Sequence, residues 1–286
     1  MRVGIDTYSY HRYLGEVYPV QNRPEQELSY EQVVDAAIAL GIEGLSIETC
    51  FLQEPVQAHC RRLTRQARDR GVEVILAWGH PLGLHGGNSD EAQQDMEECI
   101  GLCAKIGIDT LRIVGSNRRL MGTAPKELQA ERTALRLKES IKRAEDHGVR
   151  LAMENHQDFL AEDILDIIRE VDSPFLGVNY DTGNSLRLQE EPVHAATLLA
   201  PHIFATHLKD VLPVWGGNPR DWTFYAAVPA GRGIVNLPGV IRAIQAAGYE
   251  GVFAIELDYL HPDYPDEFSV LEESLSYLKK LPAQEI

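Results

Sequence analysis

A short sequence pattern recurs along the chain: a segment of helical period ends, a glycine follows, and an apolar residue begins a β-branched run. It stands at Leu40-Gly41-Ile42, Arg70-Gly71-Val72, Ile106-Gly107-Ile108, His147-Gly148-Val149 and Ala247-Gly248-Tyr249. Glycine just past a helix adopts the left-handed cap conformation at no steric cost, so the helix ends there. Repeated alternation of this kind predicts an α/β fold built on a parallel sheet.

Eight short apolar segments rich in β-branched residues are the predicted strands of this sheet. They comprise residues 3–7, 44–48, 72–77, 110–114, 150–154, 176–181, 203–209 and 252–257. Segments of helical period separate them, such as residues 29–40, 124–147 and 237–247. Eight such units in 286 residues favour one closed (β/α)₈ TIM barrel spanning residues 1–286 over an open doubly wound sheet. The sequence at the first strand reads Asp6-Thr7-Tyr8-Ser9-Tyr10, which lacks the glycine-rich fingerprint of a dinucleotide-binding fold.

One long segment, residues 211–236, is rich in glycine, proline and aromatic residues and shows no regular period. Long irregular segments inside a compact domain usually have a function. This one follows the seventh strand, on the face of a barrel where active sites lie. We therefore predict a lid-like loop at about 211–236, in which Trp215, Trp222 and Arg232 are candidates to close over a substrate.

Charge and cysteine content narrow the class of protein. The net charge is −16, from 43 acidic and 27 basic residues, and it repels phosphate backbones and anionic membranes. The four cysteines lack the spacing of a zinc site or a redox pair. No basic segment precedes an apolar run near the start, and no apolar run approaches membrane length. We expect a cytoplasmic enzyme without a nucleic-acid or membrane partner.

The last four predicted strands each carry an ionisable residue at or near their carboxyl end. These residues are Glu154, Asp181, His207 and Glu256. A lone carboxylate inside a barrel costs several kcal/mol or takes up a proton, so several converging there require a cation. Any one of the four, taken singly, is also compatible with a helix cap or a solvated charge. Three oxygens and one nitrogen suit Mn²⁺, Mg²⁺ or Co²⁺ in octahedral geometry, with two positions left for water or substrate.

The surroundings of these residues resemble the motifs of a known family. The motifs are Glu154-Asn155-His156, Asn179-Tyr180-Asp181-Thr182-Gly183-Asn184, His207-Leu208-Lys209-Asp210, Val228-Pro229-Ala230-Gly231-Arg232-Gly233 and Gly248-Tyr249-Glu250-Gly251 ahead of Glu256. Together they resemble the xylose isomerase-like TIM-barrel superfamily, and within it the sugar phosphate isomerase/epimerase branch, over essentially the whole chain. The resemblance implies that the four strand-end residues bind one divalent cation, with Mn²⁺ expected first.

The same resemblance implies further properties. Glu154 and Glu256 would also carry protons, the substrate would be a small carbohydrate, and the protein would form a homodimer or homotetramer. Ketose 3-epimerases and the apurinic-endonuclease branch have a histidine three residues after the sixth-strand aspartate, where this chain has Asn184. The epimerases also use an arginine shortly after the seventh-strand histidine, where residues 211–214 contain none. Residues 211–236 contain no Asp-x-His for a trinuclear zinc site, so DNA repair is not expected.

The expected ligands indicate an intermediate rather than a product. A divalent ion that chelates a ketone and a neighbouring hydroxyl makes the α C–H acidic. We therefore expect an isomerase or epimerase acting on a keto sugar or keto sugar acid through an enediolate held on the metal. The alternative is a lyase, a dehydratase or decarboxylase of an oxo-sugar acid or inosose, because residues 207–211 resemble inosose dehydratase. A non-catalytic binder on the same scaffold is a third possibility.

Six residues are predicted to contact the substrate. They are His11, Glu48, His156, Lys209, Trp215 and Arg232. Each also has an ordinary structural interpretation, such as a turn histidine, an exposed loop residue or a salt bridge of Lys209 with Asp210. Further candidates near the mouth are His80 and His85 after the third strand, and Arg118-Arg119 after the fourth, where a basic pair could bind an anionic group.

Overall fold

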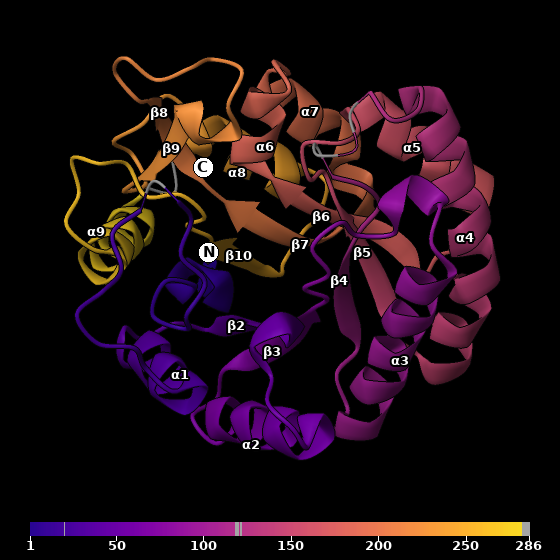
Figure 1. The fold of residues 1–286 in the computed structure, drawn as a ribbon, viewed down its shortest axis with the longest axis horizontal. Helices are drawn as coiled ribbons and strands as arrows, with labels where there is room; N and C mark the ends of the chain where they lie inside the picture. The colour runs from indigo at the N-terminus through magenta and orange to yellow at the C-terminus, as the bar shows by residue number, and fades with distance from the viewer. Residues whose placement is uncertain (20, 118–119, 121, 282–286) are drawn as a thin grey trace.

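The computed structural model describes residues 1–19, 21–117, 120 and 122–281, and its centre is a closed barrel of parallel strands. The barrel strands are β1 (Arg2–Asp6), β2 (Gly44–Glu48), β3 (Glu73–Ala77), β4 (Thr110–Val114), β5 (Arg150–Glu154), β6 (Leu176–Asp181), β7 (Ile203–Leu208) and β10 (Val252–Ile255). Each barrel strand lies beside its neighbours in sequence, and β10 pairs with β1 to close the barrel (Figure 1). The predicted (β/α)₈ barrel is therefore confirmed, and every strand boundary lies within two residues of its prediction.

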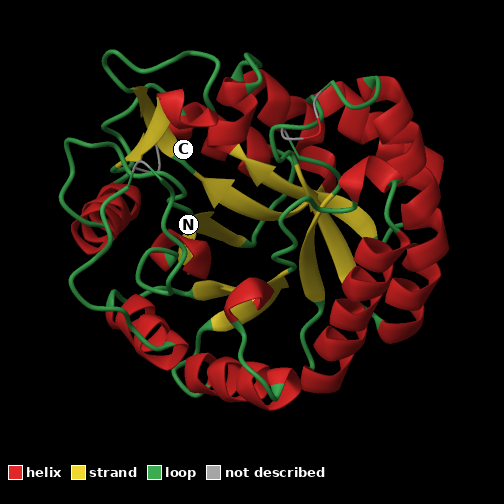
Figure 2. Ribbon diagram, in the orientation of Figure 1, coloured by secondary structure: helices red, strands yellow, loops and turns green. Residues whose placement is uncertain are grey.

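Helices surround the strands on the outside of the barrel (Figure 2). They are α1 (Tyr30–Ala39), α2 (Val56–Arg68), α3 (Asp90–Ile106), α4 (Lys126–His147), α5 (Ala161–Val171), α6 (Thr182–Arg187), α7 (Pro192–Leu199), α8 (Leu237–Ala246) and α9 (Glu267–Lys280). Their apolar faces and the barrel strands form one buried core. Among the described residues, no helix combines the length and the apolar character needed to cross a membrane.

The local signals that predicted helix boundaries are present in the structure. Ser29 begins α1 with a capping box, in which its hydroxyl accepts from the Gln32 backbone N–H and the Gln32 side chain accepts from the Ser29 backbone N–H. The five glycines of the recurring helix-end pattern all have positive φ, between 66° at Gly148 and 92° at Gly248. Because side chains other than glycine are strained in this region, these glycines end their helices sharply.

The segment after β7 is more regular than the sequence indicated. Its first residues form β8 (Asp210–Pro213), which pairs antiparallel with β9 (Tyr225–Val228) as a hairpin at the rim of the barrel (Figure 1). Asp210 accepts hydrogen bonds from the backbone N–H groups of Gly231 at 2.8 Å and Gly233 at 2.9 Å. The prediction of an irregular segment across 211–236 is therefore corrected in part, because residues 211–213 and 225–228 belong to strands. A lid role for this segment stays a prediction.

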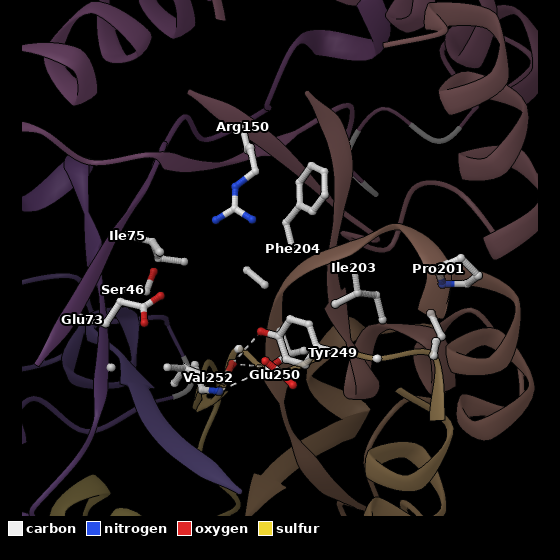
Figure 3. Close-up of a pocket in the computed structure, with 18 of the residues that line it drawn as sticks. Ser46, Glu73, Ile75, Arg150, Pro201, Ile203, Phe204, Tyr249, Glu250 and Val252 are labelled. Carbon is white, nitrogen blue, oxygen red and sulfur yellow. Dashed lines mark hydrogen bonds between the residues drawn. The ribbon is translucent and has the colours of Figure 1, made fainter. Parts of the chain in front are cut away.

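A cavity of about 370 Å³ lies at the amino-terminal ends of the strands (Figure 3). Arg150 crosses it with its guanidinium 5.2 Å from the centre of the Phe204 ring, and it also donates to the Thr110 hydroxyl at 2.8 Å. In TIM-barrel enzymes the chemistry lies at the opposite, carboxyl-terminal face. This cavity is thus on the side that ordinarily serves stability, and the candidate site lies at the other end.

Candidate metal centre and substrate cavity

Four ionisable side chains from neighbouring strands converge at the carboxyl-terminal end of the barrel. Glu154 and Asp181 are the last residues of β5 and β6, His207 lies near the end of β7, and Glu256 follows β10. All four are buried, and one ligand atom from each lies within 4.8 Å of the other three. The structure therefore brings together the four residues that the sequence predicted as ligands.

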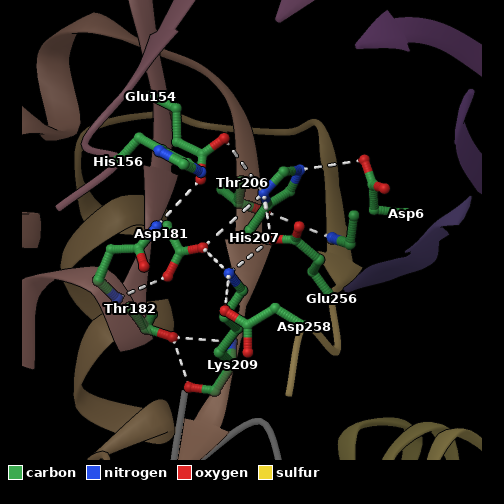
Figure 4. Close-up of polar contacts among 12 residues, drawn as sticks. Asp6, Glu154, His156, Asp181, Thr182, Thr206, His207, Lys209, Glu256 and Asp258 are labelled. Atoms are coloured by element: carbon green, nitrogen blue, oxygen red, sulfur yellow. Dashed lines mark hydrogen bonds and ion pairs between the residues drawn. The ribbon is translucent and has the colours of Figure 1, made fainter. Parts of the chain in front are cut away.

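His207 lies at the centre of this group (Figure 4). Its Nδ1 atom is 2.8 Å from Glu256 Oε2, 3.7 Å from Glu154 Oε2 and 3.8 Å from Asp181 Oδ2. The imidazole edge and one oxygen of each carboxylate thus point to a common centre.

The carboxylates use their other oxygens for hydrogen bonds within the protein. Asn184 donates from its side-chain Nδ2 to Glu154 Oε1 at 3.0 Å and from its backbone N to Asp181 Oδ1 at 2.8 Å. The four atoms that point inward are Glu154 Oε2, Asp181 Oδ2, His207 Nδ1 and Glu256 Oε2. Within the described part of the chain none of them has a hydrogen bond of good geometry, although Arg112 and Lys209 form ion pairs with the three carboxylate oxygens.

These inward-facing atoms fit a divalent cation. A buried polar atom without a hydrogen bond costs about 1–3 kcal/mol, and more when the group is charged. Burial and the nearby Glu154 and Glu256 raise the pKa of Asp181 to about 7, although Lys209 opposes the shift. A cation among the carboxylates offsets this repulsion, and three oxygens with one imidazole nitrogen form a donor set suited to Mn²⁺, Mg²⁺ or Co²⁺.

Side-chain contacts hold the strand ends in place. The Asn155 side chain donates to the Asp181 carbonyl at 2.8 Å and accepts from the Asp181 backbone N–H at 2.7 Å. Ser9 Oγ accepts from the backbone N–H of Leu257 at 3.0 Å, which fixes the chain next to Glu256. The ligand positions are therefore determined by buried polar contacts between neighbouring strand ends.

Asp6, at the end of β1, contacts the second ring nitrogen of His207. Its Oδ2 lies 3.3 Å from His207 Nε2, on the side of the ring away from the inward-facing carboxylate oxygens. Ligating histidines almost always donate their second ring N–H to a carboxylate or carbonyl, which fixes the tautomer and the ring orientation. The sequence analysis did not single out Asp6, although its place at the carboxyl end of the first strand was the available signal.

We expect Asp6→Asn to weaken Mn²⁺ binding about 10–100-fold, as loss of an outer carboxylate typically does. The amide oxygen can still accept from the Tyr8 backbone N–H, as Asp6 Oδ1 does at 2.7 Å, so the local turn should persist. Isothermal titration calorimetry measures the dissociation constant. Asp221→Asn, the same change at an exposed residue of the cavity mouth, is the control. Equal dissociation constants for the Asp6 variant and the unmodified protein would contradict the role of Asp6.

Arg112 of β4 is a second residue that the sequence analysis missed. Its Nη2 donates to Glu48 Oε1 at 2.5 Å, and its Nε lies 3.0 Å from Glu154 Oε2. The guanidinium therefore connects β2 to β5 through one buried bridge. An arginine between Leu111 and Ile113 in an apolar strand was the signal that could have identified it.

Lys209, which follows β7, lies among three carboxylates. Its Nζ is 2.9 Å from Asp181 Oδ2, 2.9 Å from Glu256 Oε2 and 3.0 Å from Asp258 Oδ2 (Figure 4). Although burial opposes the charge, these carboxylates raise the pKa of Lys209 well above its ordinary value. The lysine is therefore a permanent positive charge at the edge of the cluster.

A cavity of about 570 Å³ opens over the cluster at the carboxyl-terminal ends of the strands. One side of its lining is aromatic, with Tyr8 and Tyr18 from the segment after β1 and Trp222 from the segment between β8 and β9. Tyr18 and Trp222 pack edge to face, with ring centres 4.9 Å apart. Trp222 also lies over the guanidinium of Arg187, 5.5 Å from its ring centre.

Three of the six predicted substrate contacts line this cavity: Glu48, His156 and Lys209. His156 Nδ1 is buried without a hydrogen-bond partner among the described residues. Burial lowers the pKa of His156 below its ordinary value, so its ring is mainly neutral near pH 7. His80, a weaker candidate, also lines the cavity.

The other three predicted contacts are not placed in the cavity lining. Both ring nitrogens of His11 lie 2.6 Å from backbone carbonyl oxygens, those of Glu16 and Asp258, so the ring serves as a scaffold. Trp215 is 100% exposed in the connection just after β8. Arg232 points outward and pairs with Glu273 at 2.7 Å. The basic pair Arg118-Arg119 lies outside the described residues.

Comparison with known proteins gives relatives that are uncharacterized and relatives that have a named activity. The Escherichia coli (strain K12) protein YihM, itself uncharacterized, is 23% identical over 137 residues, which cover 46% of this chain. That alignment spans 39% of YihM, so the chain matches less than half the length of this relative. An inosose dehydratase of Mesomycoplasma hyopneumoniae (strain J) is 21% identical over 274 residues and is covered at 89%, as is this chain.

The solved structure of an L-ribulose 3-epimerase superposes with a TM-score of 0.73 at 16% identity, covering 97% of this chain and 93% of that one. At this identity the likeness shows the fold alone. The family model described as xylose isomerase-like TIM barrel matches residues 34–281, which include all four members of the candidate metal centre. The chain therefore belongs to the xylose isomerase-like TIM barrel family.

Proposed function

We propose that the protein is a divalent-metal-dependent isomerase or epimerase that acts on a keto sugar or keto sugar acid through an enediolate. The observation that carries the proposal is the set of four buried ligand atoms, one from each predicted ligand, that lie within 4.8 Å of one another. The open cavity above them, with polar and aromatic lining, is of a size that holds a small carbohydrate. Membership of the family and the fold shared with an epimerase support the same reading.

Glu154, Asp181, His207 and Glu256 would hold the ion, and we propose Mn²⁺ as the metal. When bound, a divalent ion polarises a ketone carbonyl and stabilises the negative charge that develops on its oxygen. Enolisation then requires a base near the α carbon, and a proton donor completes the reaction.

Glu154 and Glu256 are the proposed proton carriers, because they approach the cluster from different strands with His207 between them. Burial opposes their ionisation, but Arg112 and His207 lower the pKa of Glu154 to about 2. His207 and Lys209 likewise lower the pKa of Glu256. Both groups are thus deprotonated near pH 7. Removal of the α proton by one and return by the other inverts a carbon, whereas return to the adjacent carbon isomerises the sugar.

Deuterium uptake tests this proposal. The protein is loaded with Mn²⁺ and incubated in D₂O with ketopentoses, ketohexoses, inosose and keto sugar acids. We expect one deuterium to enter a carbon-bound position of at least one of these compounds, without loss of mass, and chelation of the metal to abolish the uptake. No uptake from any of them, together with no stoichiometric binding of a divalent ion, overturns the proposal.

A lyase is the second candidate, and His156 is the observation that favours it. Its neutral ring lines the cavity two residues from Glu154 and keeps Nδ1 free of hydrogen bonds. The neutral ring could take up the proton released from the α carbon and then deliver it to a departing hydroxyl, which leaves as water. The inosose dehydratase relative, which aligns along almost its whole length, has a name that states such an elimination. Loss of water from the substrate in the same D₂O experiment identifies this reaction.

The aromatic wall makes a prediction about the substrate contacts. We expect Trp222→Ala to raise KM several-fold, because Trp222 lines the cavity and packs on Tyr18. Trp215→Ala should leave KM unchanged, because Trp215 is fully exposed in the same connection between β8 and β9. Steady-state kinetics with the compound that exchanges deuterium measures both. A larger effect from Trp215→Ala would show that Trp215, and not Trp222, covers the substrate.

A further inference from the structure

Gln157, in the loop after β5, has a backbone conformation that residues other than glycine rarely adopt. Its φ is 57°, in the left-handed region, and the residue lines the cavity above the candidate metal centre. The neighbouring Asp158 holds the loop, because its carboxylate accepts from the backbone N–H groups of His156 at 3.0 Å and Phe159 at 2.7 Å. Strained backbone of this kind persists only where surrounding contacts determine it, and it is common at functional sites.

Nearby, the orientation of the Asn184 amide is fixed by two charged neighbours. The carboxylate oxygen Glu154 Oε1 can only accept a hydrogen bond, and Asn184 donates to it from Nδ2 at 3.0 Å. The guanidinium of Arg187 can only donate, and its Nη1 donates to Asn184 Oδ1 at 3.2 Å. The opposite orientation would place oxygen against oxygen at Glu154 and nitrogen against nitrogen at Arg187. Asn184 Oδ1 is therefore the atom that faces away from Glu154.

This orientation in turn fixes the amide of Gln157. Its Nε2 donates to the same Asn184 Oδ1 at 3.3 Å, so its Oε1 points the other way. Exchanging the two atoms would put two acceptor oxygens together. Gln157 Oε1 is buried, and it has no hydrogen-bond partner within the part of the chain that the structure describes. The result is an acceptor of fixed direction in the cavity wall, and leaving it unpaired costs free energy.

The missing partner of this acceptor must be a hydrogen-bond donor. Ketone, carboxylate and phosphate oxygens are acceptors, so none of these groups of a ligand can pair with Gln157 Oε1, whereas a hydroxyl can. The Asn184 amide bonds Glu154 on one side and Gln157 on the other, so Gln157 lies outside the ring of candidate metal ligands. The donor that fits is therefore a substrate hydroxyl that is not itself bound to the ion.

We propose that Gln157 determines substrate specificity by accepting a hydrogen bond from one such hydroxyl. The inference rests on the proposed function and deepens it, because it names a residue that selects for a particular hydroxyl of the ketone. A site built to bind a hydroxyl rejects the analogue that lacks it, because the polar group of the site is then left unpaired. We expect that analogue to have a kcat/KM roughly 10–100-fold below that of the parent compound.

Monodeoxy analogues of the substrate test the proposal. The parent is the ketone that reacts in the D₂O experiment. For a ketohexose such as D-fructose or D-tagatose the analogues are the 4-, 5- and 6-deoxy sugars, which keep the ketone and its neighbouring hydroxyls, and for inosose they are the deoxyinososes. The readouts are kcat/KM of the Mn²⁺-loaded protein and the dissociation constant from titration calorimetry. One analogue should fall roughly 10–100-fold below the parent, and the others much less.

Gln157→Met removes the acceptor and keeps the length of the side chain. The parent should then react about as slowly as the rejected analogue, which should itself react equally in both proteins. Gln189→Met is the matched control, because Gln189 is an exposed glutamine with a φ of 62° that is absent from the described cavity lining. It should leave every ratio unaltered. Circular dichroism and Mn²⁺ affinity show whether Gln157→Met keeps its fold, since Arg187 still holds Asn184 in that variant.

The outcomes separate this inference from the proposed function. Equal values for the parent and all its analogues in the unmodified protein overturn the inference, whether or not Gln157→Met folds, and leave the metal-dependent enolisation standing. The inference also fails if a folded Gln157→Met still rejects the same analogue. Binding without reaction removes the proposed function alone, because the dissociation constants then decide the comparison. No reaction and no binding with any ketone removes both.

Discussion

Glu154→Gln is expected to lower the affinity for Mn²⁺ at least about 100-fold and to bring deuterium exchange below detection. Loss of an outer partner typically costs 10–100-fold, and loss of a direct ligand should cost more. Asn184 determines which side-chain atom of the new glutamine faces the ion. Because its Nδ2 donates to Glu154 Oε1, the oxygen of a glutamine would stay on Asn184, and the amide nitrogen would replace Oε2. That position would then present N–H donors, not an acceptor, to the ion.

Metal content after gel filtration and titration calorimetry measure this loss. Glu250→Gln is the matched control, since it makes the same chemical change at the opposite end of the barrel. Circular dichroism shows whether the variant keeps its fold, because the hydrogen bond from Asn184 should persist. If Glu154→Gln copurifies with a stoichiometric divalent ion, the assignment of the centre is wrong.

The ligands could be predicted from sequence because each one ends or follows an apolar strand. In a parallel barrel all such ends meet at one rim, so position along the chain translates directly into position in space. Asp6 ends β1 and Arg112 lies in the middle of β4, and the roles of both depend on partners far away in sequence. The apolar strand around Arg112 indicates that this arginine is buried, but its carboxylate partners are defined only once β2, β4 and β5 have come together in the barrel.

The region after β7 shows where sequence patterns stop being informative. Its two strands contain four residues each, too short for an alternating pattern to stand out among glycines and prolines. Trp215 and Trp222 are only seven residues apart, yet one is fully exposed and the other lines the cavity. The difference arises from the hairpin, which carries Trp215 away from the barrel and turns Trp222 toward Tyr18. Side-chain direction in such a segment is set by tertiary contacts.

The second large effect is expected on stability. Arg112→Met should destabilise the metal-free protein by about 3–5 kcal/mol, which is the usual cost of removing one partner from a buried ion pair. Glu48 Oε1 would lose its 2.5 Å partner, and Glu154 Oε2 would keep only the more distant His207 nitrogen. Methionine is long and flexible enough to fill much of the vacated volume, so the loss reflects the uncompensated charges more than a void. Urea unfolding after chelator treatment measures it.

Two companion variants identify the cause of that loss. Arg112→Lys keeps the positive charge but cannot reach both carboxylates in the planar geometry of a guanidinium, so an intermediate loss is expected. Adding Glu48→Gln to Arg112→Met removes one of the two stranded charges and should recover at least about 1 kcal/mol. Bound Mn²⁺ should also recover part of the stability, because the ion would pair with Glu154 in place of Arg112. If Arg112→Met unfolds at the same urea concentration as the unmodified protein, the buried bridge between β2 and β5 contributes nothing, and Arg112 must be retained for the site alone.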